Sequence, residues 1–229
     1  MSIDKDINSK ASIRNYYNSI IKGKKHNEEN LFGQVLEDFT KILSQVTCVQ
    51  DAKALDLGYG YGNYTIALAE KGFWVTSVDI ISEKWIIDRI KDMKNKSYIT
   101  IVKKDIQFFE IIEDYDFVIA KDILHFLSAD NIYNIIKKII DHTNNGGWNY
   151  IVIFTDIKRK GKDGKVISIE GEANLSSEQF IECTNKLYKD WNLTIKLDEY
   201  KEKDNTGIED SFYFVSNKIT LIANKTKEV

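Results

Sequence analysis

The spacing of apolar residues along the chain changes near residue 53. Before that point, apolar positions recur at helical spacing and predict two helices, near residues 10–21 and 31–46. Beyond it, short apolar runs alternate with helical patterns. Strands are predicted at residues 53–57, 73–79, 98–105, 115–122 and 148–156, with helices between most of them. This alternation predicts right-handed crossovers and a parallel sheet covered by helices on both faces.

Local signals indicate where several of these elements begin and end. Gly72 is expected to cap a helix over residues 63–71, and Ser82 is expected to open a helix that runs to about Lys94. An isoleucine-rich stripe predicts the helix that follows the fourth strand, and a turn is predicted after it at residues 144–147.

The pattern loosens after residue 156. A capping box at Ser176 and Gln179 predicts one more helix, and alternating runs at 193–200 and 211–223 predict a terminal antiparallel strand pair. The expected fold is therefore α/β, with N-terminal helices and a doubly wound sheet of seven strands, mostly parallel with an antiparallel C-terminal strand.

We expect a single domain over residues 1–229. Its predicted parts are a helical region (1–48), a ligand-binding core (53–156), a polar excursion (157–174) and a C-terminal helix with a strand pair (175–229). Ligand specificity is expected from segments laid over the carboxyl edge of the sheet. The N-terminal region and the polar excursion are predicted to act as a lid there.

Composition narrows the classes of partner. The net charge is −3, and only three of the 32 basic residues are arginine, so a nucleic-acid partner is not expected. Cys48 and Cys183 are too few for a disulfide framework or a zinc site, and no metal is predicted. The first twenty residues lack an apolar signal core and no apolar run reaches membrane-spanning length, so a cytoplasmic protein without membrane contact is expected.

The segment ALDLGYGYGNYTIALAEKGFWVTSVDI, residues 54–80, carries the main functional signal. Its first strand-to-helix turn faces the ligand in a doubly wound sheet, and glycines there let the backbone approach that ligand closely. Dinucleotide enzymes prefer G-x-G-x-x-G, but here Asn63 stands where the third glycine belongs. Asp56, beside the loop, would repel a pyrophosphate and suits a ligand with an ammonium group. S-adenosylmethionine carries such a group, so this spacing disfavours an NAD-binding oxidoreductase.

Residues 50–156 resemble the class I S-adenosylmethionine-dependent methyltransferases, and the glycine loop resembles their first motif. The resemblance implies a Rossmann-like fold with an acidic residue, Asp79, on both ribose hydroxyls. It implies adenine contacts from Asp105 with Ile106, and a segment at 120–127 that lines the methionine and its methyl group. An aromatic residue on a preceding helix often closes the site in this family, which suggests Tyr16 or Tyr17. The expected cofactor-binding residues are Asp56, Gly58, Tyr59, Gly60, Gly62, Asp79, Ile80, Asp105, Ile106, Lys121 and Tyr17.

Residues 146–156 and 178–204 also resemble the tellurite-resistance methyltransferases and their thiopurine-type relatives. The basic and histidine residues that tellurite enzymes carry after the penultimate strand are replaced here by YKEKDNTG, residues 200–207. The resemblance therefore implies a small-molecule acceptor, and the replaced residues argue against tellurite.

Two residues near the fourth strand have alternative interpretations. His125 is either a general base near the acceptor or a ring that packs over the cofactor. Asp122 is either a second catalytic candidate or a helix cap. Tyr16, Tyr17 and His26 belong to the predicted N-terminal lid, although core packing explains the tyrosines equally well and a solvated surface position explains His26.

The predicted function is in-line methyl transfer from S-adenosylmethionine to a small molecule, with S-adenosylhomocysteine as the product. The sequence leaves two alternatives open: a methyltransferase acting on a peptide or another macromolecule, and a non-catalytic S-adenosylmethionine-binding regulator.

Overall fold

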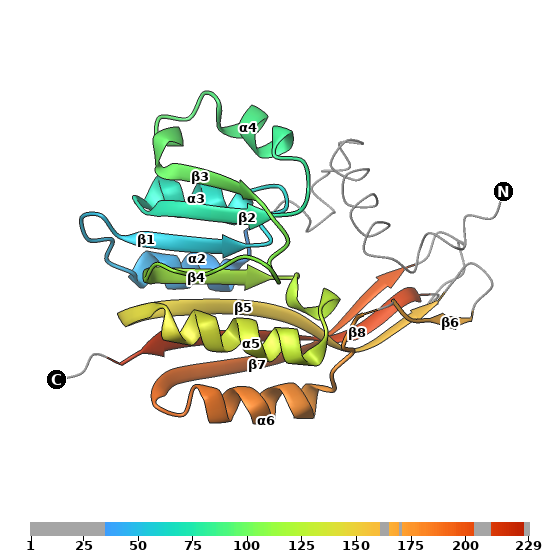
Figure 1. Cartoon of the computed structure of the whole chain (residues 1–229). Coiled ribbons are helices and arrows are strands. Elements are labelled where there is room, and N and C mark those ends of the chain that lie inside the picture. Colours follow the sequence, from blue (N-terminus) through green and yellow to red (C-terminus); the bar gives the residue numbers. More distant parts are fainter. Residues whose placement is uncertain (1–34, 161–164, 170, 204–211, 227–229) are drawn as a thin grey trace.

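The computed structural model describes residues 35–160, 165–169, 171–203 and 212–226. This part contains an eight-stranded sheet in the order β3-β2-β1-β4-β5-β8-β7, with the short β6 paired to β5 (Figure 1). Strands β1 to β5 pair in parallel, whereas β8 is antiparallel to both β5 and β7. The predicted doubly wound sheet with an antiparallel C-terminal strand is confirmed. The strands are β1 (Lys53–Leu57), β2 (Trp74–Asp79), β3 (Ile99–Lys103), β4 (Tyr115–Lys121), β5 (Thr143–Lys160), β6 (Val166–Ile167), β7 (Trp191–Lys203) and β8 (Phe212–Lys225).

Helices cover both faces of the sheet, as the alternation of patterns predicts (Figure 1). On one face, α2 (Glu37–Gln45) and α3 (Asn63–Lys71) pack on an apolar cluster around Phe39 and Leu68. On the other face, α5 (Ala129–Asp141) and α6 (Ser177–Leu187) bury Ile136 and Phe180. The shorter α4 (Lys84–Ile90) closes a third cluster with the glycine loop.

Two of the predicted helix ends are confirmed and two are wrong. Gly72 ends α3 in the left-handed conformation, and Ser176 and Gln179 form the capping box of α6. The prediction that Ser82 caps the next helix is wrong, because α4 starts after Glu83 without a side-chain cap. The predicted end near Lys94 is also wrong, because α4 ends at Ile90. A three-residue 3-10 helix (Lys96–Tyr98) follows it before β3.

β5 begins earlier than its sequence pattern predicts. Residues 144–147, expected as a turn, lie inside β5, where a register shift against β4 absorbs the extra backbone. Two side chains form hydrogen bonds at this irregularity. Asn144 Nδ2 donates to Asp116 Oδ1 at 2.9 Å, and Asn224 Nδ2 donates to the carbonyls of Gly146 and Gly147, each at 3.0 Å. These long-range bonds let the chain continue as a strand where local composition favours a turn.

A second irregularity extends β5 beyond the rest of the sheet. The pairing with β8 shifts between Thr155 and Lys158, and Asp156 there adopts a φ of 51°. The Asp156 carboxylate accepts hydrogen bonds from Ser177 N at 2.9 Å and Asn217 Nδ2 at 3.0 Å. Asn174 Oδ1 accepts from Ile157 N at 2.6 Å. These contacts fix the bulge, so the far ends of β5, β7 and β8 project together past the carboxyl edge (Figure 1).

The predicted polar excursion contains the eighth strand. β6 pairs with Arg159 and Lys160 near the tip of this extension, so the sheet has one strand more than the seven expected. β6 has only two residues, which is too short a run for an alternating pattern to reveal.

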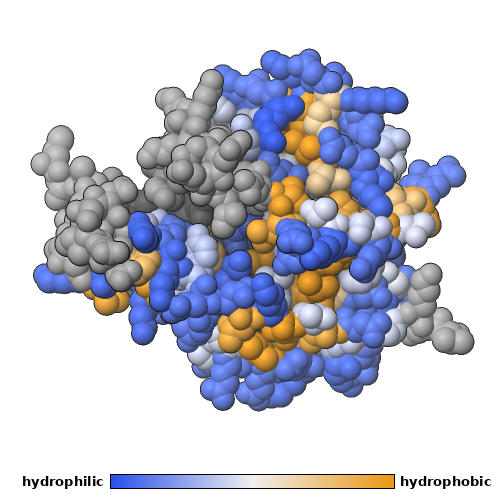
Figure 2. Space-filling model, turned by 180° about the vertical axis from the view of Figure 1, so that it is seen from behind, coloured by the Kyte–Doolittle hydropathy of each residue, from blue (hydrophilic) through white to orange (hydrophobic). Residues whose placement is uncertain are grey.

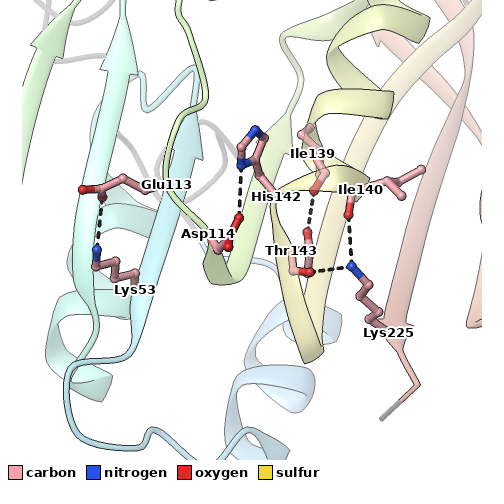
Figure 3. A network of polar contacts seen from close by, with 8 residues as sticks. All are labelled: Lys53, Glu113, Asp114, Ile139, Ile140, His142, Thr143 and Lys225. Carbon is pink, nitrogen blue, oxygen red and sulfur yellow. Dashed lines mark hydrogen bonds and ion pairs between the residues drawn. The ribbon is translucent and has the colours of Figure 1, made fainter. Parts of the chain in front are cut away.

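The opposite, amino-terminal edge of the sheet is held by a polar network (Figure 3). Lys225 Nζ donates to Thr143 O at 2.7 Å, and His142 Nδ1 lies 3.1 Å from Asp114 Oδ1. A cavity of about 210 Å³ near this edge is lined by Glu70, Met93, Lys94 and Asn95. Both features lie away from the carboxyl ends of the strands. Figure 2 shows the molecule from behind the view of Figure 1, where hydrophobic patches lie between hydrophilic residues.

Candidate functional site

The glycine loop joins β1 to α3 at the carboxyl edge, and all three of its glycines have a positive φ, between 52° and 81°. A Cβ on Gly58 would lie 2.7 Å from Ile123 Cβ, and a Cβ on Gly62 would lie 2.6 Å from Ile86 Cδ1. A Cβ on Gly60 would meet only the Gly58 carbonyl oxygen, at 4.0 Å. Gly58 and Gly62 are therefore required for packing inside the protein, whereas Gly60 faces open space.

Asp79, at the end of β2, lies directly beneath the loop. Gly60 N donates to Asp79 Oδ2 at 2.9 Å, and Ile81 N donates to Oδ1 at 3.1 Å. The side chain is buried, and this burial raises the pKa of Asp79, partly offset by the backbone hydrogen bonds. The fold thus brings the glycine loop and Asp79 together, and each carboxylate oxygen keeps a lone pair for a further donor. Their cofactor contacts stay predictions.

Asp56 is buried between β1 and α3. Its Oδ2 accepts a hydrogen bond from Thr65 Oγ1 at 2.6 Å, and Thr65 Oγ1 lies 2.8 Å from Ser77 Oγ. Its pKa is raised to about 7, mainly by burial and to a smaller extent by the charge of the nearby Asp79. Its predicted contact with the ammonium group of a ligand stays a prediction.

Tyr59 turns into the protein. Its ring belongs to the apolar cluster with Ile81, Ile86 and Ile90, and its hydroxyl is buried with no hydrogen-bond partner in the described part of the chain. Burial raises the pKa of Tyr59. A cofactor contact from this residue would come from its backbone or from the hydroxyl that lacks a partner.

Arg89, on α4, holds the loop in a way that the sequence does not reveal. It donates to the Tyr61 carbonyl through a short hydrogen bond and to Asn63 Oδ1 at 2.7 Å. Its guanidinium carbon also lies 4.0 Å from the centre of the Tyr61 ring. Arg89 is 26 residues from Asn63, so only the folded chain brings the two together.

Asp105 and Ile106 follow β3, next to Asp79. Lys104 N donates to the Asp79 carbonyl at 2.9 Å. This hydrogen bond ties the segment that carries Asp105 and Ile106 to the end of β2. The Asp105 carboxylate accepts from the backbone and the side chain of Gln107, at 3.0 and 2.9 Å. Ile106 is buried in the core, and Ile80, between Asp79 and Ile81, is half-buried. Their adenine contacts stay predictions.

The end of β4 brings Lys121, Asp122 and His125 to the same edge. Lys121 and Asp122 form a close ion pair, and Asp122 adopts a φ of 55°. Asp122 Oδ1 is buried without a hydrogen-bond partner among the described residues. The neighbouring 3-10 helix (Leu124–Phe126) has no side-chain cap, so the alternative role of Asp122 as a helix cap is not observed there.

His125 is 4% exposed, and its ring centre lies 5.1 Å from that of Phe154. Burial, with smaller effects from Arg159 and Lys121, lowers the pKa of His125 to about 3. A neutral imidazole with this pKa is a weak base, which favours the packing interpretation. Its Nδ1 nevertheless has no partner within the described ranges. The catalytic roles of His125 and Asp122 stay predictions.

Tyr16, Tyr17 and His26 fall outside the described residues. Within the described ranges, no group of three or more His, Cys, Asp or Glu side chains is arranged to hold a metal ion. None of the helices described there has the length and apolar character that a membrane crossing requires.

Comparison with known proteins places the chain in a family. The family model described as tellurite resistance protein TehB matches residues 24–202. The chain belongs to the TehB family. This confirms the resemblance to the tellurite-resistance methyltransferases that the sequence indicates.

A curated TehB of Haemophilus influenzae, named a probable S-adenosyl-L-methionine-dependent methyltransferase, is 36% identical over 131 residues. The match covers 56% of this chain and 43% of that protein, so it spans less than half of the relative's length.

Solved structures show the same fold. The crystal structure of TehB from H. influenzae aligns with a TM-score of 0.62 and 22% identity, covering 92% of this chain and 67% of that one. A Burkholderia thailandensis 1,6-didemethyltoxoflavin-N1-methyltransferase, crystallised with 1,6-didemethyltoxoflavin and S-adenosylhomocysteine, aligns with a TM-score of 0.61 and 14% identity. That alignment covers 95% of this chain and 88% of the other.

Proposed function

We propose that this chain is an S-adenosylmethionine-dependent methyltransferase that acts on a small molecule. The observation that carries this proposal is the pairing of Gly60 with Asp79. A loop amide binds the carboxylate at 2.9 Å, and the Cα of the same glycine faces open space. Family membership supports the same activity.

The residues of the chain would act mainly by binding and alignment. The cofactor supplies a methyl group already activated on a sulfonium. Asp79 would accept hydrogen bonds from the two ribose hydroxyls with the lone pairs that Gly60 N and Ile81 N leave open. Gly58 to Gly62 would cradle the amino-acid end, with the Asp56 carboxylate near its ammonium group. Fixing these groups holds the donor in the geometry that an in-line displacement needs.

The acceptor side would be built at the end of β4 from Lys121, Asp122 and His125. Two of these side chains carry buried polar atoms that have no partner within the described residues, Asp122 Oδ1 and His125 Nδ1. Unpaired buried polar atoms are costly, so their presence together supports a ligand that completes them.

A small-molecule acceptor is favoured over a macromolecular one. The chain has a net charge of −3 and three arginines, which does not suit a nucleic acid. The Burkholderia neighbour was crystallised with a small heterocyclic acceptor, which supports the same substrate size on this fold. A peptide acceptor would instead require an extended groove over the carboxyl edge.

Isothermal titration calorimetry with S-adenosylmethionine, S-adenosylhomocysteine and NAD tests the proposal. We expect both S-adenosyl compounds to bind and NAD to give no heat. Asp79→Ala should weaken S-adenosylhomocysteine binding by at least about tenfold, because it removes charge-assisted hydrogen bonds worth roughly 1.5–3 kcal/mol each. Asp88→Ala, which removes an exposed carboxylate on α4, is the matched control and should bind normally. NAD binding, or an unaffected Asp79→Ala variant that is folded, would refute the proposal.

A further inference from the structure

The extension of β5, β7 and β8 carries three aromatic side chains that touch one another. Phe154, Tyr200 and Phe214, here named the aromatic wall, have ring centres 4.8 Å (Phe154 to Tyr200), 5.5 Å (Phe154 to Phe214) and 6.0 Å (Tyr200 to Phe214) apart. The wall reaches the functional edge directly, because Phe154 also contacts His125 at 5.1 Å. It therefore borders the acceptor side of the proposed site.

Strand register places the wall on one face of the extension. Phe214 stands opposite Arg159 on β5 and opposite Glu202 on β7. Directly opposed residues of an antiparallel pair project to the same face, and so do residues two apart along a strand, such as Tyr200 and Glu202. Phe154 and Tyr200 are half-buried, whereas Phe214 is buried.

Two cations beside the wall are paired with carboxylates. Arg159 forms a bidentate ion pair with Glu172, whose side chain is 3% exposed, and its guanidinium lies 5.0 Å from the centre of the Phe214 ring. Lys121 is paired with Asp122. Among the described residues at this edge, neither cation is left to bind an anion.

Charges of both signs lie beside the wall. Glu202 accepts a hydrogen bond from Tyr200 Oη at 2.9 Å and another from Tyr213, and burial raises its pKa. Lys218 on β8 stands directly opposite Phe154, so it projects to the same face as that ring. Recognition at the wall therefore rests on its aromatic rings and not on one sign of charge.

We infer that the methyl acceptor is a planar aromatic molecule, which packs against the aromatic wall and directs a polar hydrogen toward Asp122 and His125. This inference rests on the proposed methyltransferase function and specifies the substrate class of that site. An aromatic ring matches the wall in shape and polarity. An O–H, N–H or S–H group on that ring would give Asp122 Oδ1 the hydrogen-bond partner that it lacks.

Methyl transfer to such an acceptor balances without a further reagent. A lone pair on the acceptor atom forms the new bond to the methyl carbon while the carbon–sulfur bond of the sulfonium breaks. The electrons of that bond stay on sulfur. The proton of the acceptor passes to the Asp122 carboxylate and then to water.

The test measures binding of 2-naphthol to the complex with S-adenosylhomocysteine, followed by naphthol fluorescence. We expect saturable binding of 2-naphthol, weakened about tenfold when 2-naphthoate replaces it, because a carboxylate offers Asp122 no polar hydrogen. Tyr200→Ala should weaken 2-naphthol binding about tenfold, whereas Tyr200→Phe keeps the ring and should bind within about twofold of the unmodified protein. Leu197→Ala is the control, because Leu197 is 50% exposed on the opposite face of the same strand.

A methyl-transfer assay with 2-naphthol, 2-naphthalenethiol, 6-aminoquinoline and sodium tellurite accompanies the binding test. We expect turnover of at least one aromatic probe and none of tellurite. Absence of 2-naphthol binding at millimolar concentration, unchanged binding in Tyr200→Ala, or faster methylation of tellurite than of every aromatic probe would overturn the inference. Failure of S-adenosylhomocysteine itself to bind would refute the proposed function instead, so the two failures are distinguishable.

Discussion

Replacing Asp56 with asparagine should make the ligand-free protein more stable at neutral and alkaline pH. Asp56 is 2% exposed, and burial is the main cause that raises its pKa from 3.8 to about 7. Asparagine has nearly the same shape and carries no charge, and its side-chain carbonyl can still accept the hydrogen bond from Thr65 Oγ1. The substitution therefore removes the buried charge while keeping the local contacts.

The expected size follows from the two pKa values. The pKa of Asp56 is about three higher in the folded state than in the unfolded state. Each pKa unit corresponds to about 1.36 kcal/mol, so the difference amounts to about 4 kcal/mol of free energy of unfolding. The sign is fixed because the folded protein binds more protons than the unfolded chain between pH 3.8 and about 7. The stability contribution of Asp56 is thus fully present below pH 3.8 and is lost as the pH rises through about 7.

Two other buried groups influence the same pH range, so the variant must be compared with the unmodified protein at each pH. His125 acts in the opposite direction, because its pKa is lowered from 6.5 to about 3 and its contribution to stability grows as the pH rises between these values. Asp79 acts in the same direction as Asp56, because its pKa is also raised. The difference between variant and unmodified protein removes most of both effects.

Urea unfolding between pH 4 and pH 8, without ligand, measures the effect. Asp56→Asn should match the unmodified protein near pH 4 and exceed its free energy of unfolding by about 4 kcal/mol at pH 8. The exposed Asp88→Asn is the control and should show no such trend. The same Asp56→Asn variant should bind S-adenosylmethionine more weakly, because it lacks the charge for the ammonium group. A stability difference that does not grow with pH would refute the reasoning.

Three further predictions follow from the site. Gly60→Ala should fold with only a modest loss of stability, because its Cβ enters open space. It should bind S-adenosylhomocysteine at least about tenfold more weakly, because that space is where the ligand is proposed to lie. Gly58→Ala should instead lower the melting temperature strongly, because its Cβ would lie 2.7 Å from Ile123. Normal binding by Gly60→Ala would show that the loop is an ordinary turn. His125→Asn should leave the pH profile of methyl transfer unchanged between pH 5 and pH 8, since burial keeps His125 neutral there; a lost acidic limb would identify it as the base. Removal of residues 1–28 should preserve cofactor affinity in calorimetry but suppress methyl transfer, as the predicted lid requires, and full activity would exclude that role.

The meeting of the glycine loop and Asp79 at one edge of the sheet was predictable because its signals are local in sequence. Gly58, Gly60 and Gly62 stand in one turn, and Asp79 ends the next strand, so the alternation of strand and helix alone brings them to one edge. The strand pattern also predicts the antiparallel end of the sheet correctly.

The parts that sequence reasoning missed depend on contacts between distant residues. Arg89 reaches the loop from α4, and Ile123 explains why Gly58 cannot carry a side chain. Hydrogen bonds of Asp156 and Asn174 hold the β5 bulge in place. The bulge in turn sets the direction of the extension that carries the aromatic wall. None of these partners is marked by periodicity or by a motif, because each depends on which segments the completed fold brings together.

The most direct test of the account is a crystal structure of the protein with S-adenosylhomocysteine. The account predicts both ribose hydroxyls within hydrogen-bonding distance of the Asp79 carboxylate, with the amino-acid end of the ligand over Gly58 to Gly60 and its sulfur facing Asp122. A ligand bound elsewhere, or one whose ribose makes no contact with Asp79, would contradict it.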